Sequence, residues 1–128
     1  DLGLADRVHF IGAQPADTIV PLIRQADVGV SLYVSHSLNY QTTLPNGVFQ
    51  CIAAGLPLIY PPLPEIMSLM REGAGLCVDP NDATALGQAI ADIAENDDTR
   101  HKMSSEIRAM QREIQWDQEV SRIFTVLA

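Results

Sequence analysis

Short apolar runs alternate with amphipathic helical stretches along most of this chain. Four runs have the length and the residue types of buried strands: residues 7–12, 28–33, 57–60 and 75–79. Strands that alternate with helices in this way build a parallel sheet with helices on both faces. The pattern therefore predicts an α/β fold in which all four strands point in the same direction.

Helical periodicity fills the intervals between these runs and the end of the chain. The predicted helices cover residues 17–26, 45–54, 64–73 and 82–96; the next carries Met103, Ile107, Met110 and Ile114 on one stripe, and a last one follows Trp116. Asp17 is expected to cap the first helix, Pro21 to lie in or near its first turn, and Gly55 to end the second helix. The apolar stripes of these helices indicate core contacts rather than a cofactor site.

Composition limits the classes of protein that the chain can represent. Its 128 residues are predicted to form a single partial domain spanning 1–128, and 16 acidic against 8 basic residues leave a formal charge of −8. Such a surface argues against nucleic acid as a partner. Cys51 and Cys77 form no disulfide framework and no metal-ligand spacing, so we interpret them as two buried thiols.

The helix that follows the polar loop 34–44 is the candidate ligand site. Ligands of parallel α/β folds bind outside the carboxyl ends of the strands, where loops 12–16, 34–44, 61–64 and 79–81 are expected. The first amides of the helix lack intrahelical partners and its dipole adds partial positive charge, so a phosphate would be well placed there. Asn46 and Gln50 share a face of this helix, and Gly47 allows a ligand close to the backbone. Helices that begin with proline and end with glycine also occur without ligands, so a purely structural helix is the alternative.

Three segments, in this order, resemble one enzyme family. They are LGLADRVHFIGAQPADTIVPLIRQADVGVSLY, LPNGVFQCIAAGLPLIY and GAGLCVDPNDATALGQAI. Together they are similar to the later part of the nucleotide-sugar-binding domain of GT-B glycosyltransferases of the group 1 type. The resemblance covers essentially the whole chain and implies a Rossmann-like fold from a truncated C-terminal domain. The N-terminal acceptor domain and the first βαβ unit of the donor domain would then lie outside this sequence.

The resemblance implies transfer of a sugar from a nucleotide sugar to an acceptor, with retention of configuration. The donor would be UDP-, GDP- or ADP-linked, no cofactor or metal would be bound, and the acceptor would be a glycan, a lipid-linked glycan or a small molecule. The donor-binding residues that it implies are Gly12, Ala13, Thr42, Thr43, Asn46, Gly47 and Gln50. No catalytic residue is identified. His36 lies in the same loop, where a lone histidine is usually solvated or structural.

Three polar positions depart from the family pattern. Thr42 and Gln50 stand where the family typically has glutamates that hold the donor sugar and the ribose, and Gly47 stands where a lysine is frequent. These departures favour an alternative function, a glycosyltransferase-like binding domain with weak catalysis. A sugar-nucleotide epimerase of the same fold is a further alternative. A flavodoxin-like signalling domain would need an acidic cluster that FIGAQP lacks.

Two further expectations concern location and the activity of this chain alone. No signal peptide starts the sequence and no apolar run is long enough to span a bilayer. These features predict a cytoplasmic protein, with the cytoplasmic face of the membrane as a second location for the full-length protein. Because the active site of the family lies between two domains, the chain by itself is expected to turn over no substrate.

Overall fold

The sheet is parallel and has three strands in the described part of the chain. The structure is a computed structural model that describes residues 3–34, 38–114, 120–121 and 125. Strands β1 (Gly29–Val30), β2 (Leu58–Tyr60) and β3 (Gly75–Cys77) lie in the order β1-β2-β3, and both pairs are parallel. The predicted α/β class and the common direction of these three strands are therefore confirmed.

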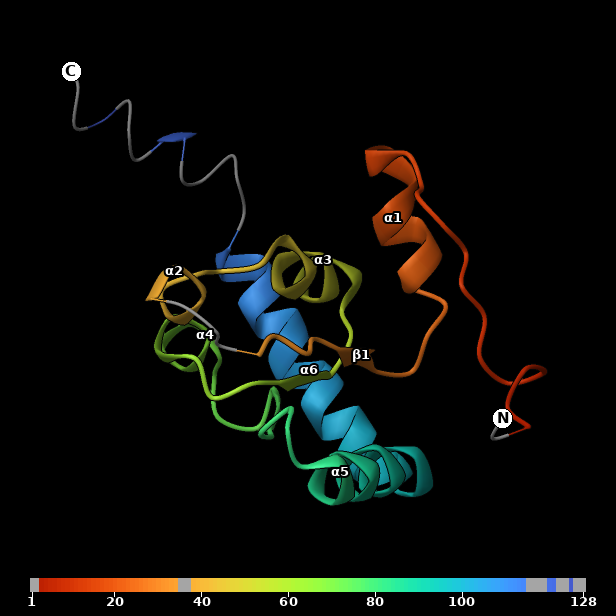
Figure 1. The fold of residues 1–128 in the computed structure, drawn as a ribbon. Coiled ribbons are helices and arrows are strands. Elements are labelled where there is room, and N and C mark those ends of the chain that lie inside the picture. Colours follow the sequence, from red (N-terminus) through yellow and green to blue (C-terminus); the bar gives the residue numbers. More distant parts are fainter. Residues whose placement is uncertain (1–2, 35–37, 115–119, 122–124, 126–128) are drawn as a thin grey trace.

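Six helices are described, and Figure 1 shows that α1 lies beside α3 and apart from the sheet. Their bounds are α1 Ala16–Ile23, α2 Leu38–Gln41, α3 Asn46–Ala54, α4 Pro64–Leu69, α5 Ala83–Glu95 and α6 Asp97–Glu113. Side-chain caps begin the last two, since Asp82 accepts from the Ala85 amide at 2.9 Å and Asn96 accepts from the Thr99 amide at 3.0 Å. Gly55 ends α3 in the left-handed conformation with φ 76°, as predicted.

Successive residues of β2 supply the two halves of the core. Leu58 packs with buried side chains of α3, α4 and the later part of α6, whereas Ile59 packs with α5 and Met103 of α6. Both strand residues are fully buried. Successive side chains of a strand point to opposite faces, so this division places helices on both faces of the sheet.

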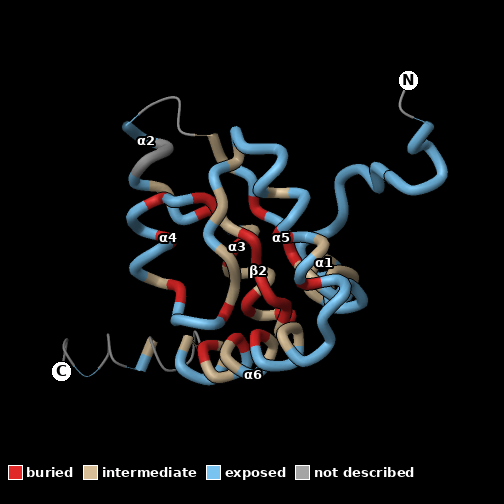
Figure 2. The backbone as a smooth tube through the Cα atoms, turned by 90° about the horizontal axis from the view of Figure 1, so that it is seen from below, coloured by how far each residue is buried: buried red, intermediate tan, exposed pale blue. Residues whose placement is uncertain are grey.

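The predicted first strand, residues 7–12, is not observed. This segment forms no ladder with a described strand, and its apolar side chains are exposed, with Val8 at 51%, Phe10 at 96% and Ile11 at 67%. Figure 2 shows the whole segment leading to α1 as exposed. The apolar pattern is that of a strand, but a strand exists only where a neighbour accepts its hydrogen bonds. The described sheet therefore has one strand fewer than predicted.

The first helix begins earlier than predicted and differs at its start. Asp17 does not cap it; α1 follows Pro15, whose carbonyl oxygen accepts from the amide and the hydroxyl of Thr18 at 3.0 and 2.8 Å. Asp17 instead lies in the first turn, where its charge complements the helix dipole. Pro21 lies inside the helix beyond that first turn.

Three further predictions need correction. The loop 34–44 contains the short helix α2, and the predicted helix 64–73 ends at Leu69 because Met70 has extended backbone. Cys51 is only partly buried and Cys77 is exposed, so they are not two buried thiols. Cys77 is exposed because it ends β3, which lies at an edge of the sheet. The predicted helix after Trp116 falls largely outside the described residues.

Candidate functional site

The amino end of α3 lies at the carboxyl edge of the sheet. Helix α3 connects β1 to β2, and these two strands are parallel. A connection of this kind must run back across the sheet, so it begins beside the carboxyl ends of the strands. Pro45 precedes α3, is buried, and has the extended backbone of a helix-capping position with φ −65° and ψ 139°.

Two backbone amides are open at this end of α3. The Val48 amide donates to the Pro45 carbonyl oxygen at 3.0 Å, and no side chain caps the helix. The amides of Asn46 and Gly47 precede that bond and donate to no described residue. A Cβ atom added at Gly47 would meet no other described residue within 4 Å, so no neighbouring segment covers this residue on that side. The arrangement offers two donors and a positive dipole end to an anion.

Gln50 lies one turn after Asn46 on the same face of α3. The opposite face carries the buried residues Val48 and Ile52, which fix the rotation of the helix about its axis. The Gln50 side chain is partly buried and makes no hydrogen bond to the described residues. Its amide can both donate and accept. The structure therefore brings Asn46, Gly47 and Gln50 together on one short helix.

Thr42 and Thr43 lie between α2 and α3. The hydroxyl of Thr42 donates toward the carbonyl oxygens of Leu38 and Asn39 at 3.3 and 3.5 Å, and its amide donates to Leu38 at 3.2 Å. Thr42 is exposed and Thr43 is half-buried. The Thr42 hydroxyl uses its hydrogen in these bonds at the end of α2, so the lone pairs of its oxygen can still accept a hydrogen bond.

Gly12 and Ala13 are not gathered with the α3 residues. Both are exposed in the extended segment before α1, which Figure 1 shows beside α1 and apart from the sheet. The Gln14 side chain closes this stretch by donating to the Ile11 carbonyl oxygen at 3.1 Å. Their assignment to the donor site stays a prediction. His36 lies outside the described residues.

Three groups near the carboxyl ends of the strands were not identified from the sequence. The hydroxyl of Ser31, directly after β1, is buried and has no hydrogen-bond partner among the described residues. Tyr60 and Cys77 are partners in the register of β2 and β3. Burial raises the pKa of Tyr60, and the charge of Cys77 raises it further; burial also raises the pKa of Cys77. Cys77 therefore lacks the lowered pKa that activates a cysteine nucleophile.

The described residues hold no cluster of three or more His, Cys, Asp or Glu side chains suited to a metal ion. The absence of a metal from the site stays a prediction.

Among the helices described, none combines the length and the apolar character needed to cross a membrane.

Sequence comparison identifies the family of the chain. A family model described as Glycosyl transferases group 1 matches residues 1–110. Comparisons with curated proteins and with solved structures gave no match. The matched region contains the whole sheet, α3 and every predicted donor-binding residue. The chain belongs to the glycosyl transferases group 1 family.

Proposed function

We propose that this chain is the donor-binding part of a glycosyltransferase that moves a sugar, with retention, from a nucleotide sugar to an acceptor. The observation that carries the proposal is the open amino end of α3, where the amides of Asn46 and Gly47 have no described partner. The diphosphate of a UDP-, GDP- or ADP-linked sugar matches these donors in charge and geometry. Membership in the family supports a glycosyl transfer reaction.

Each predicted residue has a place in this proposal. The amides of Asn46 and Gly47 hold the diphosphate, and Gln50 on the same face bonds the ribose hydroxyls. The loop that contains Thr42 and Thr43 lies beside the sugar and the diphosphate, and the segment with Gly12 and Ala13 lies beside the base. The protein contributes positioning and stabilises the charge that develops on the leaving diphosphate. A metal is not needed for this role.

The acceptor side belongs to another part of the full-length protein. Apolar side chains are exposed beside the outer edge of β1, with Val30 at 43% and Leu32 at 47%, and along the segment that carries Phe10. Parallel strands are normally buried on both faces, so these surfaces support a further domain or further strands packed against this chain. The chain alone should therefore fail to transfer sugar. A transfer assay with a radiolabelled nucleotide sugar tests this, and sustained glycosylation of an acceptor by the chain alone would contradict it.

Binding of nucleotides tests the donor site directly. Calorimetry of the full-length protein with UDP, GDP and ADP should show binding of at least one, and Gln50→Ala should weaken it about fivefold to tenfold through loss of about one hydrogen bond. Gln25→Ala is the matched control, because Gln25 is exposed near the end of α1, at the other end of the fold. Equal affinity of wild type and Gln50→Ala for every nucleotide would remove Gln50 from the site.

A second candidate is a binding domain of the same family that is catalytically weak. Thr42 and Gln50 carry no charge, so neither can supply the carboxylate expected at its position. Tight binding of nucleotide sugars without transfer by the full-length protein would favour this candidate. A sugar-nucleotide epimerase, the third class, would change the donor sugar with no acceptor present. Analysis of the products with and without acceptor separates the three.

A further inference from the structure

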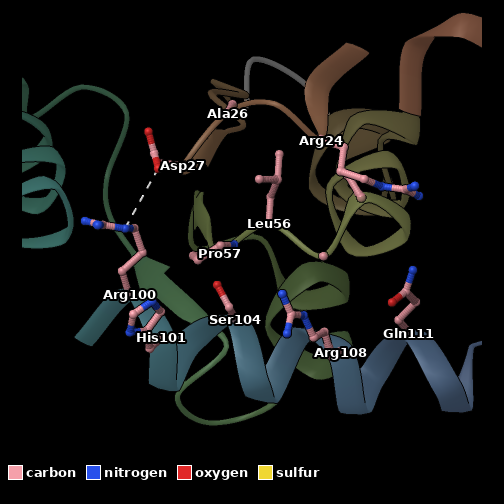
Figure 3. Close-up of a pocket in the computed structure, with 12 residues that line it drawn as sticks. Arg24, Ala26, Asp27, Leu56, Pro57, Arg100, His101, Ser104, Arg108 and Gln111 are labelled. Atoms are coloured by element: carbon pink, nitrogen blue, oxygen red, sulfur yellow. Dashed lines mark ion pairs between the residues drawn. The ribbon is translucent and has the colours of Figure 1, made fainter. Parts of the chain in front are cut away.

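A pocket of about 520 Å³ lies at the end of the sheet opposite the proposed donor site. Its walls come from the segment between α1 and β1, from the turn between α3 and β2, and from one face of α6. Figure 3 shows Ser104, Arg108 and Gln111 projecting from α6 toward the turn that holds Leu56, with Arg24 across from them. Because these segments precede β1 and β2, the pocket is at the amino ends of the strands.

Positive charge collects in this pocket although the chain is acidic. The whole sequence has 8 basic against 16 acidic residues, yet Arg24, Arg100 and Arg108 all line it, together with His101. Arg24 and Arg108 are exposed, and neither makes an ion pair or a hydrogen bond with any residue that the structure describes. An unpaired guanidinium keeps all of its donors for a ligand.

Arg100 differs from Arg24 and Arg108 because its guanidinium is already bonded to other residues of the chain. It donates to the carbonyl oxygens of Ile93 and Ala94 at 3.0 and 3.2 Å and pairs with Asp97. It thereby ends α5, as a cation at a helix carboxyl end does. Its Nε atom also lies 4.0 Å from a carboxylate oxygen of Asp27, the acidic side chain that lines the pocket. This pairing offsets the charge of Asp27.

Arg108 does not bond the carboxyl end of a helix in the way that Arg100 does. The carboxyl end of α3 faces the pocket, but its carbonyl groups have other partners: Gly55 donates to Ile52, Leu56 donates to Cys51, and Gln111 donates to Ala53. Arg108 instead runs past Gly55, with its Cγ and Nε atoms 3.9 and 4.0 Å from the place of a Cβ at that residue. The absence of a side chain at Gly55 keeps the space beside the guanidinium open.

We propose that this pocket binds a phosphate-bearing anion, with Arg24 and Arg108 as its principal ligands. Both arginines line the same pocket, and planar guanidinium groups suit the paired oxygens of phosphate. The Ser104 hydroxyl supplies a further donor from the same face of α6. This site is separate from the proposed donor site and does not depend on it.

Titration of the full chain with inorganic pyrophosphate tests the proposal, because variants inside and outside the pocket can be compared. Arg108→Gln and Arg24→Gln should each weaken binding about tenfold, the effect of losing a charge-assisted bond. Lys102→Gln is the matched control: it removes one positive charge from the exposed surface of α6 outside the pocket. All these positions are exposed or partly exposed, so the fold should be retained. Pyrophosphate binding that is kept in both arginine variants would overturn the proposal, as would equal losses in Lys102→Gln and Arg108→Gln.

Phosphate groups occur on soluble molecules and on lipid headgroups, and a second arm separates these sources. Vesicles of phosphatidylcholine with and without phosphatidylglycerol are sedimented with the wild type and the same variants. Vesicle binding that needs phosphatidylglycerol and both arginines assigns the site to a headgroup; pyrophosphate binding without vesicle binding assigns it to a soluble anion. If neither probe binds in an arginine-dependent way, the pocket is not an anion site.

Discussion

The side-chain amide of Gln111 donates a hydrogen bond to the carbonyl oxygen of Ala53 at 2.7 Å. This bond joins α6 to the last turn of α3, two helices that pack together over the same core. The carbonyl groups of a last helical turn lack intrahelical partners, so Gln111 satisfies one of them. It also fixes the carboxyl end of the helix whose amino end carries the proposed donor site.

Gln111→Ala should lower the free energy of unfolding by about 1 kcal/mol, the usual net value of one such bond, or somewhat more because it is partly buried. Urea unfolding of the full-length protein measures this. Gln88→Ala is the control: Gln88 bonds Asp92 one turn away on the exposed surface of α5, and such pairs contribute about 0.5 kcal/mol or less. Equal effects of the two substitutions would contradict the proposed role of Gln111.

Gly75→Ala should be much more damaging. A Cβ atom at this position would overlap the backbone carbonyl oxygen of Leu58, its partner in the register of β2 and β3, and would lie 3.0 Å from the carbonyl carbon. Backbone atoms of a central strand cannot move aside without breaking the ladder, so we expect a loss of about 3 kcal/mol or more.

The control for that substitution is Gly87→Ala. Gly87 lies inside α5, and a Cβ there would meet nothing within 4 Å. Alanine in the interior of a helix is favoured over glycine by about 1 kcal/mol, so this variant should be more stable than the wild type. Thermal unfolding of both variants measures the contrast. A folded Gly75→Ala protein with unchanged stability would show that β2 and β3 are not paired in this register.

Cys51 makes stability depend on pH in alkaline solution. Burial raises the pKa of its thiol above the ordinary value of 9.0, so the folded state holds the proton more tightly than the unfolded state. The free energy of unfolding is then highest below pH 9.0 and falls as the pH rises above it. The raised pKa values of Tyr60 and Cys77 act in the same direction.

Urea titrations under reducing conditions from pH 7 to pH 10 test the contribution of Cys51. Cys51→Ala should be less stable at neutral pH, because it removes packed atoms from α3, but should lose less stability as the pH rises. Cys77→Ala is the comparison: its thiol is exposed, so this substitution should change both the stability and its pH dependence less than Cys51→Ala does. A Cys51→Ala protein that follows the wild-type pH dependence would show that this thiol does not titrate differently in the two states.

Gln50→Glu introduces the carboxylate that the resemblance implies at this position. A carboxylate that accepts ribose hydroxyls makes charge-assisted bonds, so nucleoside diphosphate affinity should rise by about tenfold at most. Repulsion between the new charge and the diphosphate opposes part of this gain. Calorimetry with UDP, GDP and ADP is the measurement, and Gln25→Glu, in the turn after α1, is the control for the added charge. A gain that Gln25→Glu reproduces would come from the protein's overall charge and not from the ribose.

Much of the fold was predictable because its signals are local. Helical periodicity, apolar runs and the glycine after α3 depend on residues only a few positions apart, and they located α3, α5 and the three observed strands. The open amino end of α3 was also predictable from the sequence, because the first backbone amides of any helix lack intrahelical hydrogen-bond partners. The order of the matching segments was sufficient to predict the family.

The tertiary structure decided what depends on partners distant in sequence. Residues 7–12 have the pattern of a strand, but the described chain offers them no neighbour, and exposure of Phe10 follows. Arg24 and Arg108 belong to no local motif, and only the packing of α6 against the turn after α3 brings them into one pocket. Burial of Ser31 and exposure of Cys77 are likewise properties of the sheet's edges. The periodicity of the sequence indicates which face of a helix or strand is apolar. Which other element packs against that face is decided by the free energy of packing the whole chain.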